Sequence, residues 1–193
     1  MPRGVLDRDE IVDSLRDVAG LLATWLPDEE PTVLIVVGGS YMALRGLRLA
    51  TADVDTVTRL QVTVRDAVNV VARRRHLRPN WLNDYAQPFT PVGLRLDMCD
   101  VLLDLPSLRV LGPPPDCIFL MKLYAGRAPD FEDMVTLWPL CTFASASEAA
   151  ERFVAAYPQA PPDPDLIPYI TEIADLADTP ASTPSPATTA DRT

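Results

Sequence analysis

An uninterrupted apolar run at residues 33–37, with the sequence VLIVV, is the most distinct hydrophobic pattern in the chain. Such a run has the composition of a buried β-strand. The small residues Gly-Gly-Ser at 38–40 end the run, and residues 41–47 are predicted to form a short helix. A second strand follows and carries Asp53 and Asp55. The pattern therefore predicts a strand–turn–helix–strand unit at the centre of the fold.

Helical patterns flank this unit on both sides. In the first of them Ile11, Leu15, Val18 and Leu22 recur at spacings of three and four, and Asp7 is the predicted N-cap. Similar spacing, or residues that start and stop helices, predicts the others. The predicted helices span residues 7–25, 64–75, 116–125, 130–137, 147–157 and 166–176.

The stretch between the second and third of these helices is less regular. Residues 81–91 mix aromatic and amide side chains with prolines, which predicts a loop. Residues 93–101 alternate between apolar and polar side chains, which predicts a β-strand. Residues 104–111 are expected to form a connector, or else an edge strand that ends at Gly112.

Together these elements place the chain in the α/β (α+β) class, with a small mixed sheet packed by helices and a helical C-terminal half. A length of 193 residues fits one domain. We expect residues 1–112 to hold the sheet and residues 113–176 to form the helical part. Residues 177–193 are rich in Pro, Ala and Thr, which is the composition of a disordered tail.

Composition narrows the location and the chemistry. No run of about 18 apolar residues occurs, so we expect no association with a membrane. The charged N-terminal segment does not resemble a secretory signal, and a cytoplasmic location is expected. Cys99, Cys117 and Cys141 form no close pair, which argues against a disulfide framework or a zinc site. His76 is the one histidine and is too isolated for a Ser-His-Asp hydrolase.

Charge is spread unevenly along the chain. The net charge of −10 argues against broad, non-specific binding of nucleic acid. Residues 40–80, however, contain eight arginines against three aspartates. This segment either forms a local basic face beside the central unit or is a solvated surface that keeps the protein soluble.

The central unit combines residue types that suit a nucleotide and a metal ion. Backbone N–H groups of the turn, with Gly39 and the hydroxyl of Ser40, would meet a phosphate at the start of the helix, although Ser40 could instead serve as its N-cap. Asp53 and Asp55 are two apart on a strand, so both carboxylates face the same side, with their Cα atoms roughly 7 Å apart. Two such carboxylates beside a phosphate predict bound Mg²⁺ or Mn²⁺. Alternation favours Asp97 as a third carboxylate, whereas a bulge would favour Asp100.

A second candidate lies in the predicted helix 116–125, where Lys122 has mostly apolar neighbours. A buried ammonium group is costly unless an anion pairs with it, and either nucleotide phosphates or Asp130 would serve. The alternative is a lysine that extends along the surface into solvent.

These two stretches resemble a known family. Gly39-Ser40, twelve further residues and Asp53-Val54-Asp55 resemble the signature of the polymerase-β-like nucleotidyltransferase superfamily. The stretch from Lys122 to Asp133 resembles the helical motif of its AbiEii-type and MenT-type toxin branch.

The resemblance implies a nucleotidyltransferase fold and specific roles for the matching residues. Asp53, Asp55 and Lys122 would be catalytic. Asp130 would complete the site and is preferred over Asp133, because it matches the register of the motif. Arg127 would contact phosphate, or else form a salt bridge to Glu132 or Asp133.

The implied reaction moves a nucleoside monophosphate from an NTP to an acceptor hydroxyl and releases pyrophosphate. The acceptor would be a tRNA 3′ end, and the protein would be the toxin of a toxin–antitoxin pair with an antitoxin protein as its partner. One alternative is transfer to a small molecule, such as an antibiotic, or to a protein. Another is a binding module that has the fold without the catalysis.

Overall fold

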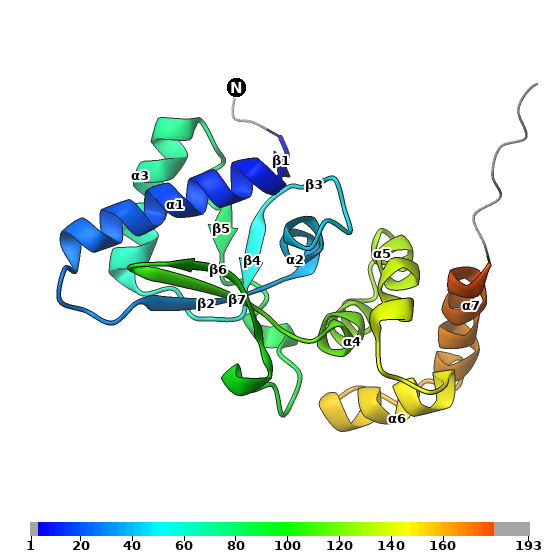
Figure 1. Ribbon diagram of the computed structural model, residues 1–193. Helices are drawn as coiled ribbons and strands as arrows, with labels where there is room; N and C mark the ends of the chain where they lie inside the picture. Colours follow the sequence, from blue (N-terminus) through cyan, green and yellow to red (C-terminus); the bar gives the residue numbers. More distant parts are fainter. Residues whose placement is uncertain (1–3, 180–193) are drawn as a thin grey trace, which may run out of the picture.

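The computed structural model describes residues 4–179 and has a five-stranded mixed sheet at its centre (Figure 1). Across the sheet the strands are β5 (Leu82–Asn83), β4 (Val54–Thr56), β2 (Thr32–Val37), β7 (Leu108–Gly112) and β6 (Asp100–Leu105). The pairs β2–β7 and β4–β5 are parallel, whereas β2–β4 and β6–β7 are antiparallel. A separate antiparallel pair joins β1 (Leu6–Asp7) to β3 (Ala50–Thr51).

Seven α-helices surround the sheet in the described part of the chain, which confirms the predicted mixed α/β class. They are α1 (Arg8–Trp25), α2 (Gly38–Leu44), α3 (Val62–Arg75), α4 (Pro115–Ala125), α5 (Asp130–Leu137), α6 (Ala146–Ala156) and α7 (Leu166–Asp178). Helices α1 and α3 lie together on one side of the sheet, and α4 to α7 form a helical group at the other end of the molecule (Figure 1).

Helix α1 begins where the sequence predicts. The Asp7 carboxylate accepts a hydrogen bond from the Glu10 N–H at 2.8 Å, and the Glu10 carboxylate accepts one from the Asp7 N–H at 3.2 Å. This reciprocal pair satisfies two N–H groups that lack partners within the helix. The apolar stripe on the helix is buried as far as Leu22, whereas Trp25 remains 40% exposed.

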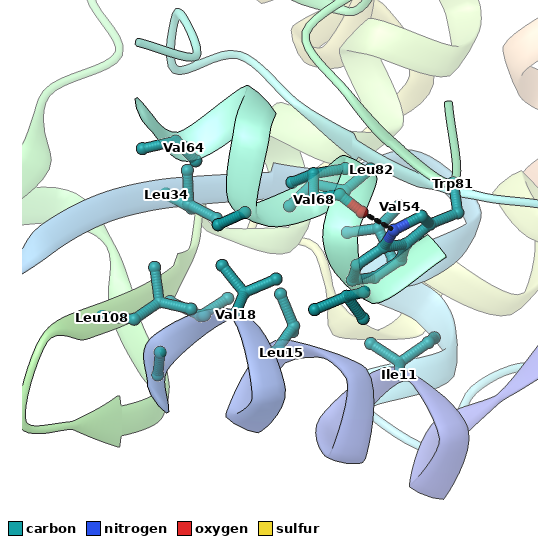
Figure 2. Packing of buried hydrophobic residues seen from close by; sticks show 14 of the residues in the cluster. Ile11, Leu15, Val18, Leu34, Val54, Val64, Val68, Trp81, Leu82 and Leu108 are labelled. Atoms are coloured by element: carbon teal, nitrogen blue, oxygen red, sulfur yellow. Dashed lines mark hydrogen bonds between the residues drawn. The ribbon is translucent and has the colours of Figure 1, made fainter. Parts of the chain in front are cut away.

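The first hydrophobic core fills the space between the sheet and helices α1 and α3. Figure 2 shows Leu15 from α1, Leu34 from β2 and Val68 from α3 meeting there. Trp81 is buried in the same cluster, and its indole N–H donates to the carbonyl of Val68 at 3.2 Å. Because that polar group has a partner, the large ring is buried without an unsatisfied donor.

A second core joins α2 to the helical C-terminal part. Tyr41 and Met42 of α2 pack with Phe119 of α4, and Ile173 of α7 is fully buried in the same cluster. The two cores lie on either side of α2 and the adjoining end of β2. The predicted helix at 166–176 therefore docks, as α7, against the rest of the chain.

Two expectations for residues 93–111 are wrong. Residues 93–98 form a turn and a short 3₁₀ helix, Leu96–Met98. Gly93 adopts a positive φ, which is not the conformation of a β-strand, and Leu96 is exposed where a strand packed on the core would bury it. The strand begins at Asp100, and a tight connection at Pro106-Ser107 returns the chain into β7. Strand β7 lies inside the sheet, between β2 and β6, and is not an edge strand.

The helical pattern continues slightly further than predicted at the C-terminal end. Helix α7 extends to Asp178, two residues into the predicted tail, and residues 180–193 lie outside the described part. Between residues 4 and 179, no helix has both the length and the apolar character needed to cross a membrane.

Candidate active site

A cavity of about 370 Å³ lies between the sheet, with α2, and the helical C-terminal part. Its walls come from the end of β2, the β3–β4 segment, the loop after β5, and α4 with the loop that follows it. Six residues that the sequence singled out line it together: Gly39, Asp53, Asp55, Lys122, Arg127 and Asp130. Tertiary folding thus brings the two separate sequence motifs to one cavity.

The carboxylate pair, Asp53 and Asp55, forms part of the wall of this cavity. Asp55 lies within β4, opposite Val37 of β2 and Asn83 of β5, while Asp53 lies just before the strand. Burial raises the pKa of Asp53, and the guanidinium groups of Arg78 and Arg127 partly offset this rise.

The pKa of Asp55 is raised by burial and by the negative charge of Asp53, against a hydrogen bond from Asn83 that lowers it. Because burial raises the pKa of both carboxylates, and the charge of Asp53 raises that of Asp55 further, a cation beside them would be stabilising.

The glycine turn is needed for steric reasons. Gly38 begins α2 with a φ of +64°, and a Cβ there would lie 3.2 Å from Oδ2 of Asp55. A Cβ on Gly39 would lie 2.5 Å from Oγ1 of Thr51. Glycine therefore lets the backbone pass close to a carboxylate on one side and to a hydroxyl on the other.

Ser40 has a different role from either one expected. Its side chain is 1% exposed, and its hydroxyl donates to the carbonyl of Val37 at 2.9 Å. The N-cap of α2 is Val37 itself, which caps without a side-chain hydrogen bond. Because Ser40 is the third residue of the helix, its hydroxyl turns back onto the chain and does not line the cavity.

Lys122 is buried, not extended into solvent. The side chain is 5% exposed, and Nζ lies 2.7 Å from Oδ1 of Asp130 and 2.7 Å from Oδ2 of Asp133. Arg48 also donates to Oδ2 of Asp133, at 3.0 Å. Both candidate aspartates therefore bind Lys122, but Asp130 lines the cavity and Asp133 does not. An ammonium group has three donors, so one N–H of Lys122 remains for a ligand.

Arg127 forms no salt bridge to Glu132 or Asp133 among the described residues. Its guanidinium carbon lies 5.8 Å from the ring centroid of Phe89, a distance at which a cation and an aromatic face attract. The side chain is exposed at the cavity and is free to meet an anion.

Neither Asp97 nor Asp100 joins the carboxylate pair. Asp97 lies on the 3₁₀ helix, where Oδ1 pairs with Nε of Arg95 at 3.0 Å, and its side chain is 69% exposed. Asp100 begins β6 and pairs with Arg45. The expectation of a third carboxylate at Asp97 or Asp100 is wrong, because neither residue lines the cavity. Asp97 lies before the strand that was predicted to carry it, since that strand begins only at Asp100.

Sequence reasoning missed several residues of the cavity. Arg48 and Thr51 lie in the segment between the turn and the carboxylates, and Tyr85 and Phe89 lie in the loop after β5. The eight arginines of residues 40–80 indicated a basic region, but no spacing distinguished Arg48 among them. The aromatic residues of the predicted loop were visible in the sequence without any sign that they face a cavity.

The donor set fits a magnesium ion. In residues 4–179 no group of three His, Cys, Asp or Glu side chains forms a metal cluster. Mg²⁺ is usually held by one or two carboxylates, with waters and substrate phosphates as its other ligands. Asp53 and Asp55 would supply those carboxylates. Burial raises the pKa of each despite the nearby positive side chains, so a bound cation would offset part of the cost of their charge.

The lining of the cavity combines charged and apolar side chains. The charged ones include the two carboxylates with Arg48, Lys122 and Arg127, and the apolar or aromatic ones are Tyr85, Ala86, Phe89, Ile118, Met121 and Ala125. Such a combination suits a ligand that has an anionic part and a flat or apolar part. No protein-family model, curated protein or solved structure matches this chain.

Proposed function

We propose that this protein has a nucleotidyltransferase fold and is a Mg²⁺-dependent enzyme that moves a nucleoside monophosphate from an NTP to an acceptor hydroxyl. The observation that supports it best is the meeting of two motifs in one cavity. Asp53 and Asp55 lie beside the glycine turn, and Lys122, Arg127 and Asp130 approach from the helical part.

Asp53 and Asp55 are the residues that would hold Mg²⁺, or Mn²⁺ in its place. When bound, the ion would offset negative charge on the reacting phosphate and on the pyrophosphate that leaves. The chain's own cations act on the same groups. Arg127 and the remaining N–H of Lys122 would bind phosphate oxygens, while Asp130 and Asp133 hold Lys122 in place.

The apolar and aromatic side chains of the cavity are proposed to hold the base. Phe89 and the exposed ring of Tyr85 offer aromatic faces, and stacking on such faces tolerates every base. Because Arg127 lies over the ring of Phe89, its guanidinium group would lie between the base and the phosphates of the nucleotide. This arrangement orients the nucleotide so that the acceptor hydroxyl meets the phosphate along a fixed line.

For the acceptor we propose RNA, in particular a tRNA 3′ end. Arg73 and Arg74 are exposed on the last turn of α3, and Arg78 is close enough to lower the pKa of Asp53 partly. None of these three pairs with a carboxylate in the described part of the chain. An unpaired arginine near Asp53, with two further unpaired arginines at the end of the preceding helix, favours a polyanionic acceptor over a cationic antibiotic.

The resemblance of both motifs to toxin nucleotidyltransferases extends the proposal to a biological role. The protein would act in the cytoplasm as the toxin of a toxin–antitoxin pair, held inactive by an antitoxin protein. Expression of the wild-type chain should then arrest growth, whereas a chain without the carboxylate pair should not.

The direct test is incubation of the full chain with Mg²⁺, each of the four α-labelled NTPs and total cellular RNA. We expect label on RNA in the size range of tRNA, at the 3′ end. The double variant with Asp53→Asn and Asp55→Asn should lose at least about a thousandfold in rate, because it loses the carboxylates that hold the ion.

A matched control is Asp97→Asn, since Asp97 is an exposed carboxylate outside the cavity. It should label RNA at the wild-type rate. Wild-type activity in the double variant, with a native circular dichroism spectrum, would contradict the proposal. Label on a protein or on a small molecule, and not on RNA, would support the proposed reaction but contradict RNA as its acceptor.

A further inference from the structure

A second, smaller cavity of about 190 Å³ lies beside the candidate active site, and residues from α3 and from 79–85 line most of it. Tyr85 lines both this second cavity and the larger one. Asn83, which also lines the second cavity, is the partner of Asp55 in the β4–β5 pair. The second cavity is therefore next to the strand that carries one of the candidate metal ligands.

Three amide side chains, Asn69, Asn80 and Asn83, line the second cavity. Asn83 is buried and already bonded, because its Oδ1 accepts from the N–H of Tyr85 at 2.9 Å and its Nδ2 donates to the carbonyl of Asn80 at 3.4 Å. Asn69 and Asn80 are exposed, and their side-chain amides make no hydrogen bond within residues 4–179. Each of these two amides offers a donor and an acceptor, the combination that recognises the edge of a nucleobase.

Tyr85 adds an aromatic surface to the same cavity. Its side chain is 65% exposed, and its hydroxyl makes no hydrogen bond in the described part of the chain. An exposed aromatic ring is a surface on which a base can stack. At about 190 Å³ the cavity is smaller than the roughly 300 Å³ of pockets for drug-sized ligands, so it suits one flat ring system and not a whole nucleotide.

Arginines on α3 flank the amides. Arg65, Asn69 and Arg73 follow one another at a spacing of four, which places them on one face of the helix. Arg65 is held by the carbonyl of Leu60 at 3.1 Å and by Oδ2 of Asp84 at 2.7 Å, and its other N–H groups remain for a ligand. Cations on either side of an amide suit a nucleic-acid strand, whose phosphates bind the cations while its bases contact the amide.

We propose that the second cavity binds an unstacked nucleobase of the acceptor RNA, close to the 3′ end. Asn69 and Asn80 would contact the edge of this base, and Tyr85 its face, as is usual where proteins bind single-stranded RNA. This inference rests on the proposed function, because it takes RNA as the acceptor. It gives the acceptor a site separate from that of the NTP, and so fixes the 3′ hydroxyl beside the carboxylates.

The test measures binding of a short, fluorescein-labelled, single-stranded RNA to the full chain by fluorescence anisotropy, without NTP and at one salt concentration. A set of RNAs in which one nucleotide at a time is abasic shows which base matters. For wild type, loss of the base at one position near the 3′ end should weaken binding about tenfold, within the range for a stacked base.

The double variant with Asn69→Ala and Asn80→Ala removes the two amides from the second cavity. It should bind the intact RNA about threefold more weakly than wild type, and bind the critical abasic RNA as wild type does. The two changes are not additive because the amides have no base to contact in the abasic RNA. Both positions are exposed, so the variant should keep its fold, which circular dichroism checks.

Two controls separate the second cavity from general effects. Gln61 is an exposed amide at the other end of α3 and lines neither cavity, so Gln61→Ala should bind RNA as wild type does. Calorimetry with an NTP and Mg²⁺ should give the same affinity for wild type and the double variant, because Asn69 and Asn80 do not line the larger cavity.

The outcomes distinguish this inference from the proposed function. Absence of RNA binding by wild type, RNA binding that no abasic position weakens, or wild-type RNA affinity in the double variant would overturn the inference, even if nucleotidyl transfer were observed. Loss of NTP affinity in place of RNA affinity would also overturn it, because the second cavity would then hold the base of the NTP. The expected pattern of affinities would support it even if no label reached RNA, a result that would contradict the proposed function alone.

Discussion

Asp53 and Asp55 are acidic side chains that the fold holds in the cavity at the expense of stability. Burial raises the pKa of each, so the folded chain binds protons more readily than the unfolded chain. The free energy of unfolding therefore falls as pH rises from the ordinary carboxyl pKa through the raised folded-state pKa. Side chains that are present although they lower the stability of the folded state are typical of functional sites.

A neutral replacement of similar shape should remove this penalty. Asp55→Asn is expected to raise the melting temperature at pH 7 with EDTA present, and the gain should shrink as pH falls towards the ordinary carboxyl pKa of about 4. Thermal denaturation at several pH values between 4 and 8 measures it. Asp97→Asn should give no gain, because the hydrogen bond from Arg95 lowers the pKa of Asp97. An Asp55→Asn variant no more stable than wild type at pH 7 would refute the explanation.

Replacing Lys122 should lower the stability of the protein, in contrast to Asp55→Asn. Replacing it with Met removes the positive charge that Asp130 and Asp133 share at 2.7 Å, and leaves two carboxylates largely buried. We expect a loss of roughly 3 kcal/mol in the free energy of unfolding, the lower end for a broken buried pair, since both carboxylates keep some solvent contact. Urea denaturation tests this. Adding Asp133→Asn to the variant should recover part of the loss; a stability equal to wild type in Lys122→Met alone would show that the pairing contributes little.

At the scale of secondary structure, helix ends and helix interiors place opposite demands on glycine. Gly20 is exposed within α1, and a Cβ there would contact nothing within 4 Å. Gly126 ends α4, just before Arg127, and also has open space around it, but its φ is +59°. The two positions therefore differ in backbone conformation, not in crowding.

Alanine should have opposite effects at these positions. Gly20→Ala should stabilise the chain by about 0.5–1 kcal/mol, because alanine loses less conformational entropy in a helix. Gly126→Ala should destabilise it by about 1 kcal/mol, since the left-handed conformation is costly for a residue with a Cβ. Chemical denaturation of both variants measures the difference, and effects of the same sign would contradict the helix boundaries described here.

At the scale of the whole molecule, one tyrosine connects the helical part to the wall of the cavity. Tyr157, just after α6, is 1% exposed and donates to the carbonyl of Phe89 at 2.7 Å. Its ring also stacks on Tyr124 of α4, with centroids 4.1 Å apart. The position of Phe89 at the cavity therefore depends on packing within the C-terminal helices.

Removal of that hydroxyl should affect both stability and nucleotide binding. Tyr157→Phe leaves the Phe89 carbonyl without its partner and should cost about 1–2 kcal/mol in unfolding free energy. If Phe89 supports the base, KM for the NTP should rise as well, while binding of tripolyphosphate should not change. Tyr169→Phe is the control, because the Tyr169 hydroxyl makes no hydrogen bond in the described part of the chain. Unchanged stability in Tyr157→Phe would show that the loop is held by other contacts.

Local patterns predicted most of the elements and half of the site. The start of α1 at Asp7, the central strand and the helices of the C-terminal half follow from short-range rules of capping and periodicity. Helix α2, by contrast, begins at Gly38, three residues earlier than predicted. Residues 93–111 were predicted wrongly because alternation alone does not show whether a strand has a partner. Strand β7 is central because it pairs with β2 as well as with β6, and β2 is distant from it in sequence.

By itself, the sequence determined which chemical groups the chain offers: a glycine turn, a pair of carboxylates two residues apart, and a lysine among apolar neighbours. These follow from residue type and spacing along one element. Only the tertiary structure decided which groups meet. It joined Lys122 to two aspartates, turned Ser40 away, excluded Asp97, and brought Arg48 and Thr51 to the cavity. The orientation of the helices and strands relative to one another, and the distances between them, depend on the packing of the two cores on either side of α2. A local sequence pattern does not predict this packing.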